Sequence, residues 1–428
     1  MSQELIAADV VIVGAGAAGL TLAHALTAPG GGRLSIVLVE APEGPLRPPD
    51  RTWCFWEEAE GEYEDAVVAS WRRLRVHGAD GERIERKLDA LRYKMVPSTR
   101  FEEVVSERLG STSGVRRVTA TAHEVRQVSE GAEVRCTTAD GDELTVRGRS
   151  LYDSRPPRVR PPSRTTLLQH FRGWFVHTDG PAFDPDVVEL MDFRVPQPRH
   201  GLAFGYVLPL GPRDALVEYT EFSRAPLSRQ AYESALELYT REVLKLGPLL
   251  VRGAEEGVIA MTDARFPRRA GSAAFRIGAA GGATRPATGY TFAAVQRQTR
   301  EIADGLRTEG RATAPAPHPR RALAMDAVLL RALDTGRIDG PDFFTSLFRH
   351  TPPDRLLRFL DGRTRLWEDI RIGFTTPVRP MLRTALELPL LRRTAERGPG
   401  AHGGGRTPPL AEEGTDDTPA GPGPRPRL

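Results

Sequence analysis

The chain has 428 residues, of which 40% are hydrophobic and 27% charged, so it can bury a sizeable core in one large or two closely joined domains. Its 59 basic and 56 acidic side chains give a formal charge of +3, which indicates no strongly basic surface for a nucleic acid. Two cysteines are too few for a disulfide framework or a thiolate metal site, and the histidines lack metal-site spacing. We therefore expect a cytoplasmic protein that binds neither nucleic acid nor metal.

The first part of the chain reads as a strand, a tight turn, a helix and a second strand. The run "VVIV" at residues 10–13 leads into "GAGAAG", and a later apolar run ends at Glu40. Gly14 suits the tight turn, Gly16 lets the backbone approach a pyrophosphate, and Gly19 lets helix and strand pack closely. Glu40 can bind the hydroxyl pair of a ribose. The pattern predicts a Rossmann-type dinucleotide-binding unit, with a glycine-rich packing turn as the simpler alternative.

The middle of the chain reads as antiparallel strands. "EVRCTTADGDELTV" alternates around an Asp-Gly turn and predicts a hairpin, followed by a buried strand in "SLYDS". "HGLAFGYVLPL" and "DALVEYTEF" predict a second antiparallel pair. In the last strand Glu218 shares a face with Leu216 and Phe222, so desolvation is expected to raise its pKa. Glu221 points to the other face, where we expect a solvated charge.

A second glycine-rich loop, "IGAAGGATRPATGY" at residues 277–290, lies far from the first in sequence. It follows a predicted strand and precedes a helix expected from about Thr291, so its amide groups can bind a phosphate or a flavin carbonyl. The predicted cofactor contacts are Gly278, Gly281, Gly282, Thr288 and Gly289. Two such loops favour FAD over NAD, although a plain turn is the alternative interpretation of the second one.

Helical spacing extends from residue 322 to about residue 395, and the glycine- and proline-rich tail beyond it is expected to be disordered. The predicted fold class is α/β: a Rossmann-type FAD-binding domain with a mixed or antiparallel-sheet substrate domain and a helical C-terminal part. The predicted divisions are an FAD-binding domain over residues 1–165, a substrate domain over 166–265, a return to the FAD-binding domain over 266–310, a helical region over 311–396 and a disordered tail over 397–428.

Segments spread over nearly the whole chain, up to about residue 380, resemble the FAD-dependent lycopene cyclases of the bacterial β-cyclase type. The glycine motif is shared by many flavoproteins, whereas "RTWCFW", "MDF" followed by Gln197, and "PATGYTF" are more particular to the cyclases. "DSRPP" stands where related hydroxylases carry an Asp-Gly motif. The resemblance implies that one or both ψ ends of lycopene, or of a related carotene such as γ-carotene, are closed to β-ionone rings without net redox change. It also implies FAD in its reduced form and NAD(P)H as the reductant.

The resemblance further implies roles for individual residues. Glu218 matches the glutamate of the cyclase E-x-T position and is our candidate acid or base, with a structural carboxylate as the alternative. Glu255 matches the glutamate of the E-x-G-x-I-P-M motif, in which Ala260 replaces the proline, and Asp192 matches the "MDF" position. We predict these three carboxylates as the catalytic set. Arg100, at the start of a helix, is predicted to reach the cofactor, with a surface arginine as the alternative.

The implied reaction begins with protonation of the terminal C1=C2 double bond. Because an alkene is a very poor base, the acid must be kept protonated in an apolar pocket that excludes water. Trp53, Phe55 and Trp56 are three aromatic side chains in four residues, which suits either the lining of such a pocket or an ordinary core.

A carotene resides in the bilayer, so the enzyme must meet a membrane surface. Residues 379–393 carry apolar and basic side chains in one helical stretch, which favours peripheral attachment to an anionic membrane, or else a helix packed on the body. Two other functions stay open. One is an FAD-dependent monooxygenase or isoprenoid reductase of the same fold, which consumes NAD(P)H in proportion to product, and the other is a flavin-binding protein without turnover.

Overall fold

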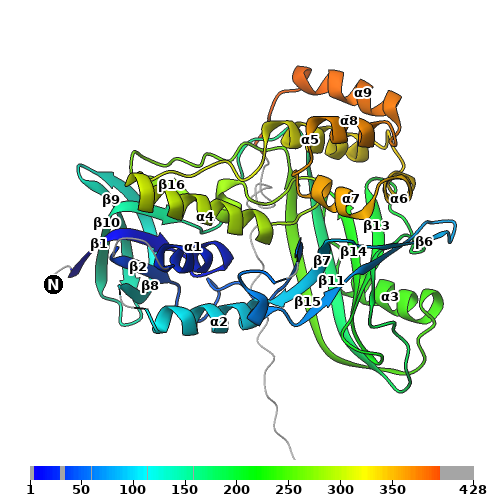
Figure 1. Cartoon of the computed structure of the whole chain (residues 1–428), viewed down its shortest axis with the longest axis horizontal. Coiled ribbons are helices and arrows are strands. Elements are labelled where there is room, and N and C mark those ends of the chain that lie inside the picture. The colour runs from blue at the N-terminus through cyan, green and yellow to red at the C-terminus, as the bar shows by residue number, and fades with distance from the viewer. Residues whose placement is uncertain (1–3, 29–33, 59, 113, 158, 396–428) are drawn as a thin grey trace, which may run out of the picture. The chain divides into compact units, whose positions relative to one another are not determined.

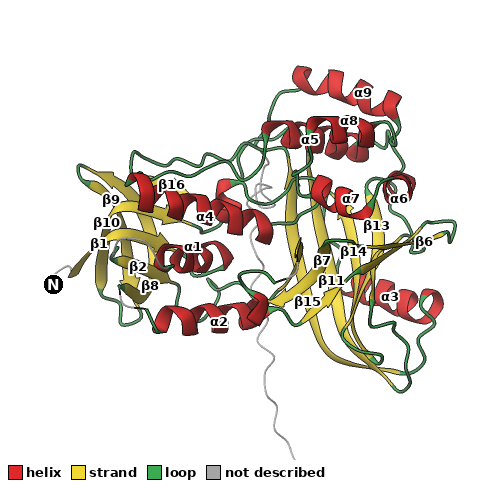
Figure 2. Ribbon diagram, viewed as in Figure 1, coloured by secondary structure: helices red, strands yellow, loops and turns green. Residues whose placement is uncertain are grey.

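The computed structural model describes residues 4–28, 34–58, 60–112, 114–157 and 159–395 (Figure 1). The tail predicted to be disordered, residues 397–428, lies outside the described residues. The described strands form three sheets, and helices cover their faces (Figure 2). Within the described part, no helix combines the length and the apolar character needed to cross a bilayer.

The first sheet carries the glycine motif at the end of its N-terminal strand. Its members are β1 (Glu4–Val13), β2 (Ile36–Glu40), β8 (Val115–Val128), β9 (Gly131–Thr138), β10 (Glu143–Asp153) and β16 (Ala274–Arg276). Parallel pairs join β8 to β2, β2 to β1, β1 to β10 and β10 to β16, whereas β9 pairs antiparallel with both β8 and β10. The hairpin expected around the Asp-Gly turn is confirmed as β9 and β10.

Different elements pack on the two faces of the first sheet, as the alternating side chains of β1 show. Val10 and Ile12 belong to the apolar cluster that includes the helices, whereas Val11 and Val13 belong to the cluster that includes β9. The covering helices are α1 (Ala17–Thr27), α2 (Ser98–Gly110) and α4 (Phe292–Glu309). A buried, mostly parallel sheet with helices on one face confirms the predicted Rossmann-type α/β fold.

The second sheet is mixed and has seven strands. In spatial order they are β15 (Leu249–Thr262), β11 (Thr166–Thr178), β14 (Asp214–Ser223), β13 (Leu202–Pro209), β12 (Val187–Asp192), β5 (Arg73–His77) and β6 (Arg83–Lys87). All neighbours pair antiparallel except β12 and β5. The expected pair β13 and β14 is confirmed. β5 and β6 fall within residues 1–165, the range predicted for the FAD-binding domain, yet they extend this second sheet.

The two faces of the second sheet have different neighbours. On one face α3 (Arg229–Leu238), capped by the Ser228 side chain, packs with Val217 and Tyr219 of β14. On the other face Leu216 and Phe222 pack with the third sheet and the C-terminal helices. The third sheet is antiparallel and consists of β3 (Thr52–Glu58), β7 (Leu91–Pro97) and β4 (Ala69–Trp71). The β14 alternation therefore places Glu218 on the face shared with the third sheet, as predicted.

Glu221 lies on the α3 face of β14, and the prediction of a solvated charge there is wrong. Its side chain is buried because α3 covers that face, and the Tyr219 hydroxyl donates to it at 3.4 Å. Burial raises the pKa of Glu221.

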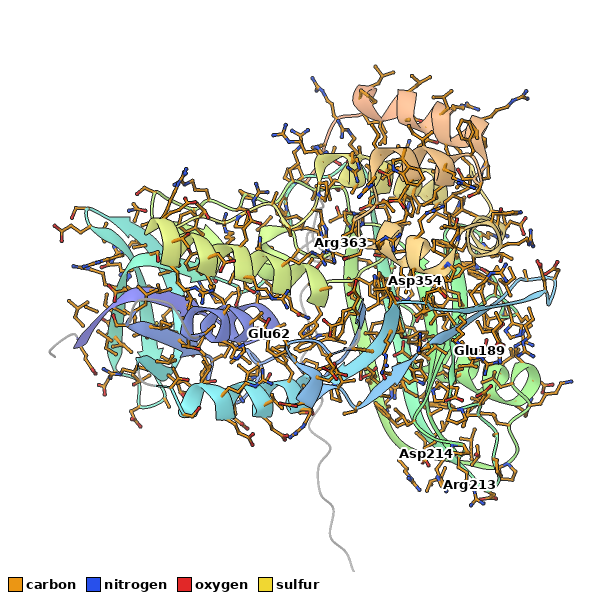
Figure 3. All side chains as sticks on the ribbon, viewed as in Figure 1. Glu62, Glu189, Arg213, Asp214, Asp354 and Arg363 are labelled. Carbon is orange, nitrogen blue, oxygen red and sulfur yellow. The ribbon has the colours of Figure 1, made fainter. Side chains whose placement is uncertain are left out.

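The C-terminal part is helical, as expected. It contains α5 (Arg320–Asp334), α6 (Gly340–His350), α7 (Pro353–Leu360), α8 (Leu366–Gly373) and α9 (Val378–Glu387). Leu330, Phe344 and Leu357 bury their side chains in the same cluster as the second sheet. At the start of α7, Asp354 accepts hydrogen bonds from the amides of residues 89 to 91 at 2.8 to 3.0 Å, which fixes this helix to the turn before β7 (Figure 3).

Candidate active site

A cavity of about 2810 Å³ extends from the two glycine loops to the inner face of the second sheet. Gly14, Gly16 and Gly278 line one part of it, and Glu218 and Phe222 line another. Ligand pockets commonly measure roughly 300–1,000 Å³. The cavity therefore has room for a dinucleotide and a second large ligand.

The first glycine loop has the geometry that its spacing predicts. Gly14 has a φ of +97°, and its amide donates to the carbonyl of Val39 at 2.8 Å. A Cβ atom on Gly19 would lie 1.8 Å from the Gly14 carbonyl oxygen, whereas one on Gly16 would meet nothing within 4 Å. Gly16 immediately precedes α1 and faces the cavity. The unpaired amides of a first helical turn form an anion site, so a pyrophosphate can approach the backbone here.

Glu40 ends β2 at the wall of the same cavity, where a ribose would lie in a Rossmann-type site. Its Oε2 atom accepts hydrogen bonds from Arg117 at 2.8 Å and Arg47 at 3.1 Å. The two guanidinium groups hold the carboxylate in place at the end of the strand.

The second glycine loop lines the same cavity, and its Gly278 lies against Ala18 of α1. Gly278, Gly282 and Gly289 have φ angles of +61°, +83° and +73°, a region that favours glycine. Gly281 is equally constrained, because a Cβ atom on it would lie 2.5 Å from the Arg276 carbonyl oxygen. All four glycines line the cavity, so the backbone can approach a ligand there.

Two buried polar atoms beside this loop have no protein partner among the described residues. They are the Thr288 hydroxyl and the Gln169 carbonyl oxygen Oε1, and both residues line the cavity. Because buried polar groups are normally hydrogen-bonded, these atoms indicate that a polar ligand belongs here. Together with the glycine cradle, they fit a dinucleotide whose ring system extends between the two loops.

Arg100 lies on the surface of α2, and the structure does not bring it to the cavity. The side chain is 45% exposed and pairs with Glu103 at 3.1 Å. The same helix turns Phe101 into the core, so its neighbour Arg100 points to solvent.

A row of side chains crosses four neighbouring strands of the second sheet. Tyr206 of β13 is paired with Glu218 of β14, Glu218 with Gly173 of β11, and Gly173 with Glu255 of β15. Residues directly opposite one another in antiparallel strands share a face, so this row points into the cavity together. The Glu218 and Glu255 side chains are hydrogen-bonded to each other, and Thr52 Oγ1 donates to Glu255 Oε2 at 2.7 Å.

The environment of the two carboxyl groups favours their protonated forms. Burial raises the pKa of Glu218 well above its usual range, and the nearby charge of Glu255 raises it further. Burial also raises the pKa of Glu255, partly offset by the hydrogen bonds from Glu218 and Thr52. The pair is therefore suited to hold a proton in the buried part of the cavity.

Phenol groups surround this carboxyl pair. The Tyr93 hydroxyl oxygen lies 2.8 Å from that of Tyr206 and 2.9 Å from that of Tyr290. Burial raises the pKa of Cys54, which also faces the pair, to about 12. Sequence reasoning missed Thr52, Cys54 and the three tyrosines as site residues, although Thr52 and Cys54 lie in the quoted "RTWCFW" segment and Tyr290 in "PATGYTF".

The three aromatic residues of β3 take different positions. Trp53 lines the cavity and stacks on Phe292 with ring centroids 5.2 Å apart. Trp56 meets Tyr290 edge to face at 4.5 Å. Phe55 is buried in the core under the helices. Trp53 is thus part of the cavity wall, Trp56 supports a wall residue from behind, and Phe55 has a packing role.

Asp192 is fully buried but does not line the cavity, so the structure does not bring it to Glu218. Its Oδ2 atom accepts from Arg194 at 2.6 Å and from the Tyr239 hydroxyl at 3.1 Å. His77 and Glu189 lie beside it (Figure 3 labels Glu189), and Arg194 already neutralises the carboxylate. Gln197, the other residue of that motif, bonds backbone groups at residue 203.

Comparison with known proteins gives one family and one fold. The model of the family described as "Lycopene cyclase protein" matches residues 9–386. Among curated protein sequences, no significant match was found. A solved flavoprotein/dehydrogenase from Cytophaga hutchinsonii is similar with a TM-score of 0.59 at 14% identity, covering 90% of this chain and 99% of that chain.

Two other similar structures have the same overall fold. A geranylgeranyl bacteriochlorophyll reductase-like protein from Thermoplasma acidophilum has a TM-score of 0.55 at 13% identity, covering 90% of this chain and 97% of that one. The flavin-dependent monooxygenase PieE, solved in complex with FAD and substrate, has a TM-score of 0.57 at 16% identity, covering 90% and 72%. The fold is thus that of flavoprotein reductases and monooxygenases.

Proposed function

The chain belongs to the lycopene cyclase protein family, and we propose that it is a flavin-dependent lycopene β-cyclase. In this proposal it closes one or both ψ ends of lycopene, or of a related carotene, to β-ionone rings without net redox change. The observation that carries the proposal is the buried Glu218 carboxyl group, hydrogen-bonded to Glu255 in the same cavity that meets the two glycine loops.

FAD is the cofactor that the cavity suits best. Gly14, Gly16 and Glu40 would hold its pyrophosphate and ribose, and Thr288 and Gly289 would contact its ring system. In its reduced form, for which NAD(P)H would be the reductant, the flavin supplies negative charge that stabilises a nearby carbocation.

The carboxyl pair supplies the proton that starts the reaction. Glu218 donates it to C2 of the terminal C1=C2 double bond, which leaves a tertiary cation at C1. The π electrons of the C5=C6 bond then form the C1–C6 bond and move the positive charge to C5. Loss of the proton from C6 restores the C5=C6 double bond and returns a proton to the carboxylate, so the β ring has the formula of the open end.

The cavity walls suit a hydrocarbon and its cation. Phe204, Phe222 and Phe344 line the part of the cavity that contains Glu218. Their ring faces stabilise positive charge by cation–π interaction, and their apolar bulk excludes the water that would trap the cation as an alcohol.

The C-terminal helices support peripheral attachment to an anionic membrane. α8 and α9 lie together beside α5 (Figure 1) and carry exposed apolar side chains four residues apart. The exposed apolar residues are Leu366, Trp367, Ile370 and Phe374 of α8 and its end, Val378, Leu382 and Leu386 of α9, and Leu390 after it. Arg371, Arg379 and Arg383 are exposed among them, which suits anionic head groups.

The proposed membrane surface lies close to one side of the cavity. Leu323 of α5 is 38% exposed and lines the cavity, and α9 packs on α5. A carotene that leaves the bilayer beside α9 would therefore meet the cavity next to the proposed membrane surface.

Anaerobic incubation in D₂O tests the proposed reaction. Purified protein is given FAD, a chemical flavin reductant and lycopene in liposomes, and the products are separated and weighed by mass spectrometry. We expect cyclic carotene of unchanged formula apart from deuterium, formed with reduced flavin and lost in Glu218→Gln. Glu221→Gln is the matched control, because this second buried glutamate of β14 lies on the opposite face.

The same experiment separates the competing activities. A product two hydrogens heavier would indicate a reductase, and one an oxygen heavier would indicate a monooxygenase; the similar structures include a reductase-like protein and a monooxygenase. Unchanged lycopene in the presence of bound reduced flavin would overturn the substrate assignment.

A further inference from the structure

Gly173 lies between the two glutamates and leaves the space in which their side chains meet. A Cβ atom on Gly173 would lie 2.6 Å from Glu218 Cγ and 2.9 Å from Leu216 Cδ1. Real Cβ atoms do not approach other atoms so closely. Any side chain at position 173 would therefore have to displace Glu218.

The strand arrangement explains why this gap matters. Glu218 and Glu255 are on strands that both flank β11, so they are two strand spacings apart, roughly 10 Å between their backbones. The Glu218 side chain crosses this distance by extending over the bare backbone of Gly173. An isolated glycine within a strand commonly marks such a close approach.

We propose that Gly173 is a positioning residue that holds Glu218 and Glu255 as one proton-sharing pair, and that this pair, rather than Glu218 alone, is the acid of the reaction. The inference deepens the proposed cyclase function, and the role of the pair as the catalytic acid rests on that function. The pairing itself is a property of the protein without substrate and can be measured separately.

The side chains around the pair do not take the shared proton from the two carboxyl groups. Cys54 of β3, Tyr206 of β13 and Tyr290 lie near the Glu218 carboxyl group, and the Tyr93 hydroxyl of β7 is hydrogen-bonded to both of these phenols. These are a thiol and three phenols, and the nearby charge that raises the pKa of Glu218 is that of Glu255.

The hydrogen bond from Thr52 makes the two carboxyl groups unequal in their affinity for the proton. Its hydroxyl donates to Glu255, which stabilises the ionised form of that carboxyl group. Glu218 is the more buried of the two, and it has the charge of Glu255 beside it. The proton of the pair therefore resides on Glu218, which is the carboxyl group that would protonate the alkene.

Infrared titration of the carboxylic acid C=O band tests the pairing without turnover. The full chain and the variants Gly173→Ala and Glu255→Gln are titrated in D₂O, and Glu218→Gln identifies the band. Gly253→Ala is the matched control, because it replaces a glycine of β15 whose added Cβ would touch the Phe175 ring at an ordinary 3.7 Å. The alkaline limit of cyclisation is measured on the same samples.

We expect both variants to lower the titration midpoint of Glu218 by about one pH unit, because Glu255→Gln removes the neighbouring carboxylate and Gly173→Ala displaces Glu218 from it. The alkaline limit of activity should move by the same amount, and Gly253→Ala should leave both unchanged. If Gly173→Ala fails to fold, Glu255→Gln, which is nearly isosteric, decides whether the pair is the acid, and a folded Gly173→Ala protein with the wild-type midpoint would overturn the positioning role of Gly173.

Midpoints that stay at the wild-type value in Glu255→Gln would overturn the pairing. A midpoint that moves in a protein forming no cyclic carotene would uphold the pair and overturn the cyclase function, so the two failures are distinguishable. A moved midpoint with an unmoved alkaline limit would show that the pair exists but is not the acid.

Discussion

The carbonyl oxygen of Gly14 occupies the place that a side chain on Gly19 would take, 1.8 Å from the position of its Cβ atom. Gly16, in the same motif, has open space at that position and a φ of −81° that any residue adopts. The two glycines therefore serve different purposes. One lets α1 pack on the turn, and the other keeps the backbone open to a ligand.

We predict opposite outcomes for alanine at these two positions. Gly19→Ala should lower the free energy of unfolding by about 1–3 kcal/mol, because the turn must move. Gly16→Ala should leave the melting temperature of the FAD-free protein unchanged and weaken FAD binding by tenfold or more. Thermal unfolding and fluorescence titration with FAD measure the two effects. A Gly16→Ala protein that binds FAD like wild type would show that the pyrophosphate does not approach residue 16.

Asp192→Asn tests whether this carboxylate acts in the reaction or in the fold. Asp192 is fully buried and paired with Arg194 and Tyr239, so removing its charge should cost about 3 kcal/mol of stability. Since it does not line the cavity, turnover per folded molecule and the product should be those of wild type. Urea unfolding and cyclisation assays of the same preparation give the comparison. Lost turnover at unchanged stability would restore the catalytic role predicted from sequence.

Local periodicity explains what could be predicted. The glycine turn after β1, the hairpin of β9 and β10, and the inward face of β14 each depend on neighbours within a few residues, so spacing alone indicates them. The direction of the Asp192 side chain could not be predicted in this way. All six residues of β12 are buried, so the strand has no alternation of buried and exposed side chains. A register shift between Glu189 and Met191 further changes which face each residue takes.

The residues that complete the site depend on contacts distant in sequence. Glu218 meets Glu255 through the pairing of β14, β11 and β15, and Thr52 reaches Glu255 from the third sheet. No pattern among neighbouring residues in the sequence shows how these three strands are aligned with one another. One signal was present: a glycine inside the strand "FRGWFV" indicates close approach of neighbouring groups, and Gly173 is that residue.

The hydrogen bonds that Glu62 accepts connect α1 with α4, and we predict that acid weakens them (Figure 3 labels Glu62). A hydrogen bond from His24 and a hydrogen bond and charge from Arg300 lower the pKa of Glu62 to about 2, against the opposing effect of partial burial. Because the folded-state pKa lies below the unfolded value of 4.5, this stabilisation is present above pH 4.5 and is lost as the pH falls toward 2.

Glu62→Gln should therefore lower stability at pH 7 by about 1–2 kcal/mol, a figure reduced for the solvent that reaches this half-buried group. Its stability should also fall less steeply than that of wild type between pH 4.5 and pH 2. Denaturant unfolding at a series of pH values measures both. Glu43→Gln, at a carboxylate 94% exposed, is the control and should follow wild type. Parallel curves for Glu62→Gln and wild type would contradict the assignment.

The exposed face of α8 and α9 gives the last prediction. Phe374 is 75% exposed and Leu386 is 69% exposed, so replacing both with glutamate should leave the fold intact. If this face enters an anionic bilayer, Phe374→Glu/Leu386→Glu should lose most of its co-sedimentation with anionic vesicles and its activity on lycopene in liposomes. Activity on lycopene in detergent should persist, because the cavity is unchanged. Leu250→Glu, at a residue 60% exposed on β15, controls for the added charge. Equal sedimentation of both variants with wild type would place the membrane contact elsewhere, and equal binding with lost liposome activity would assign this face to carotene transfer rather than to attachment.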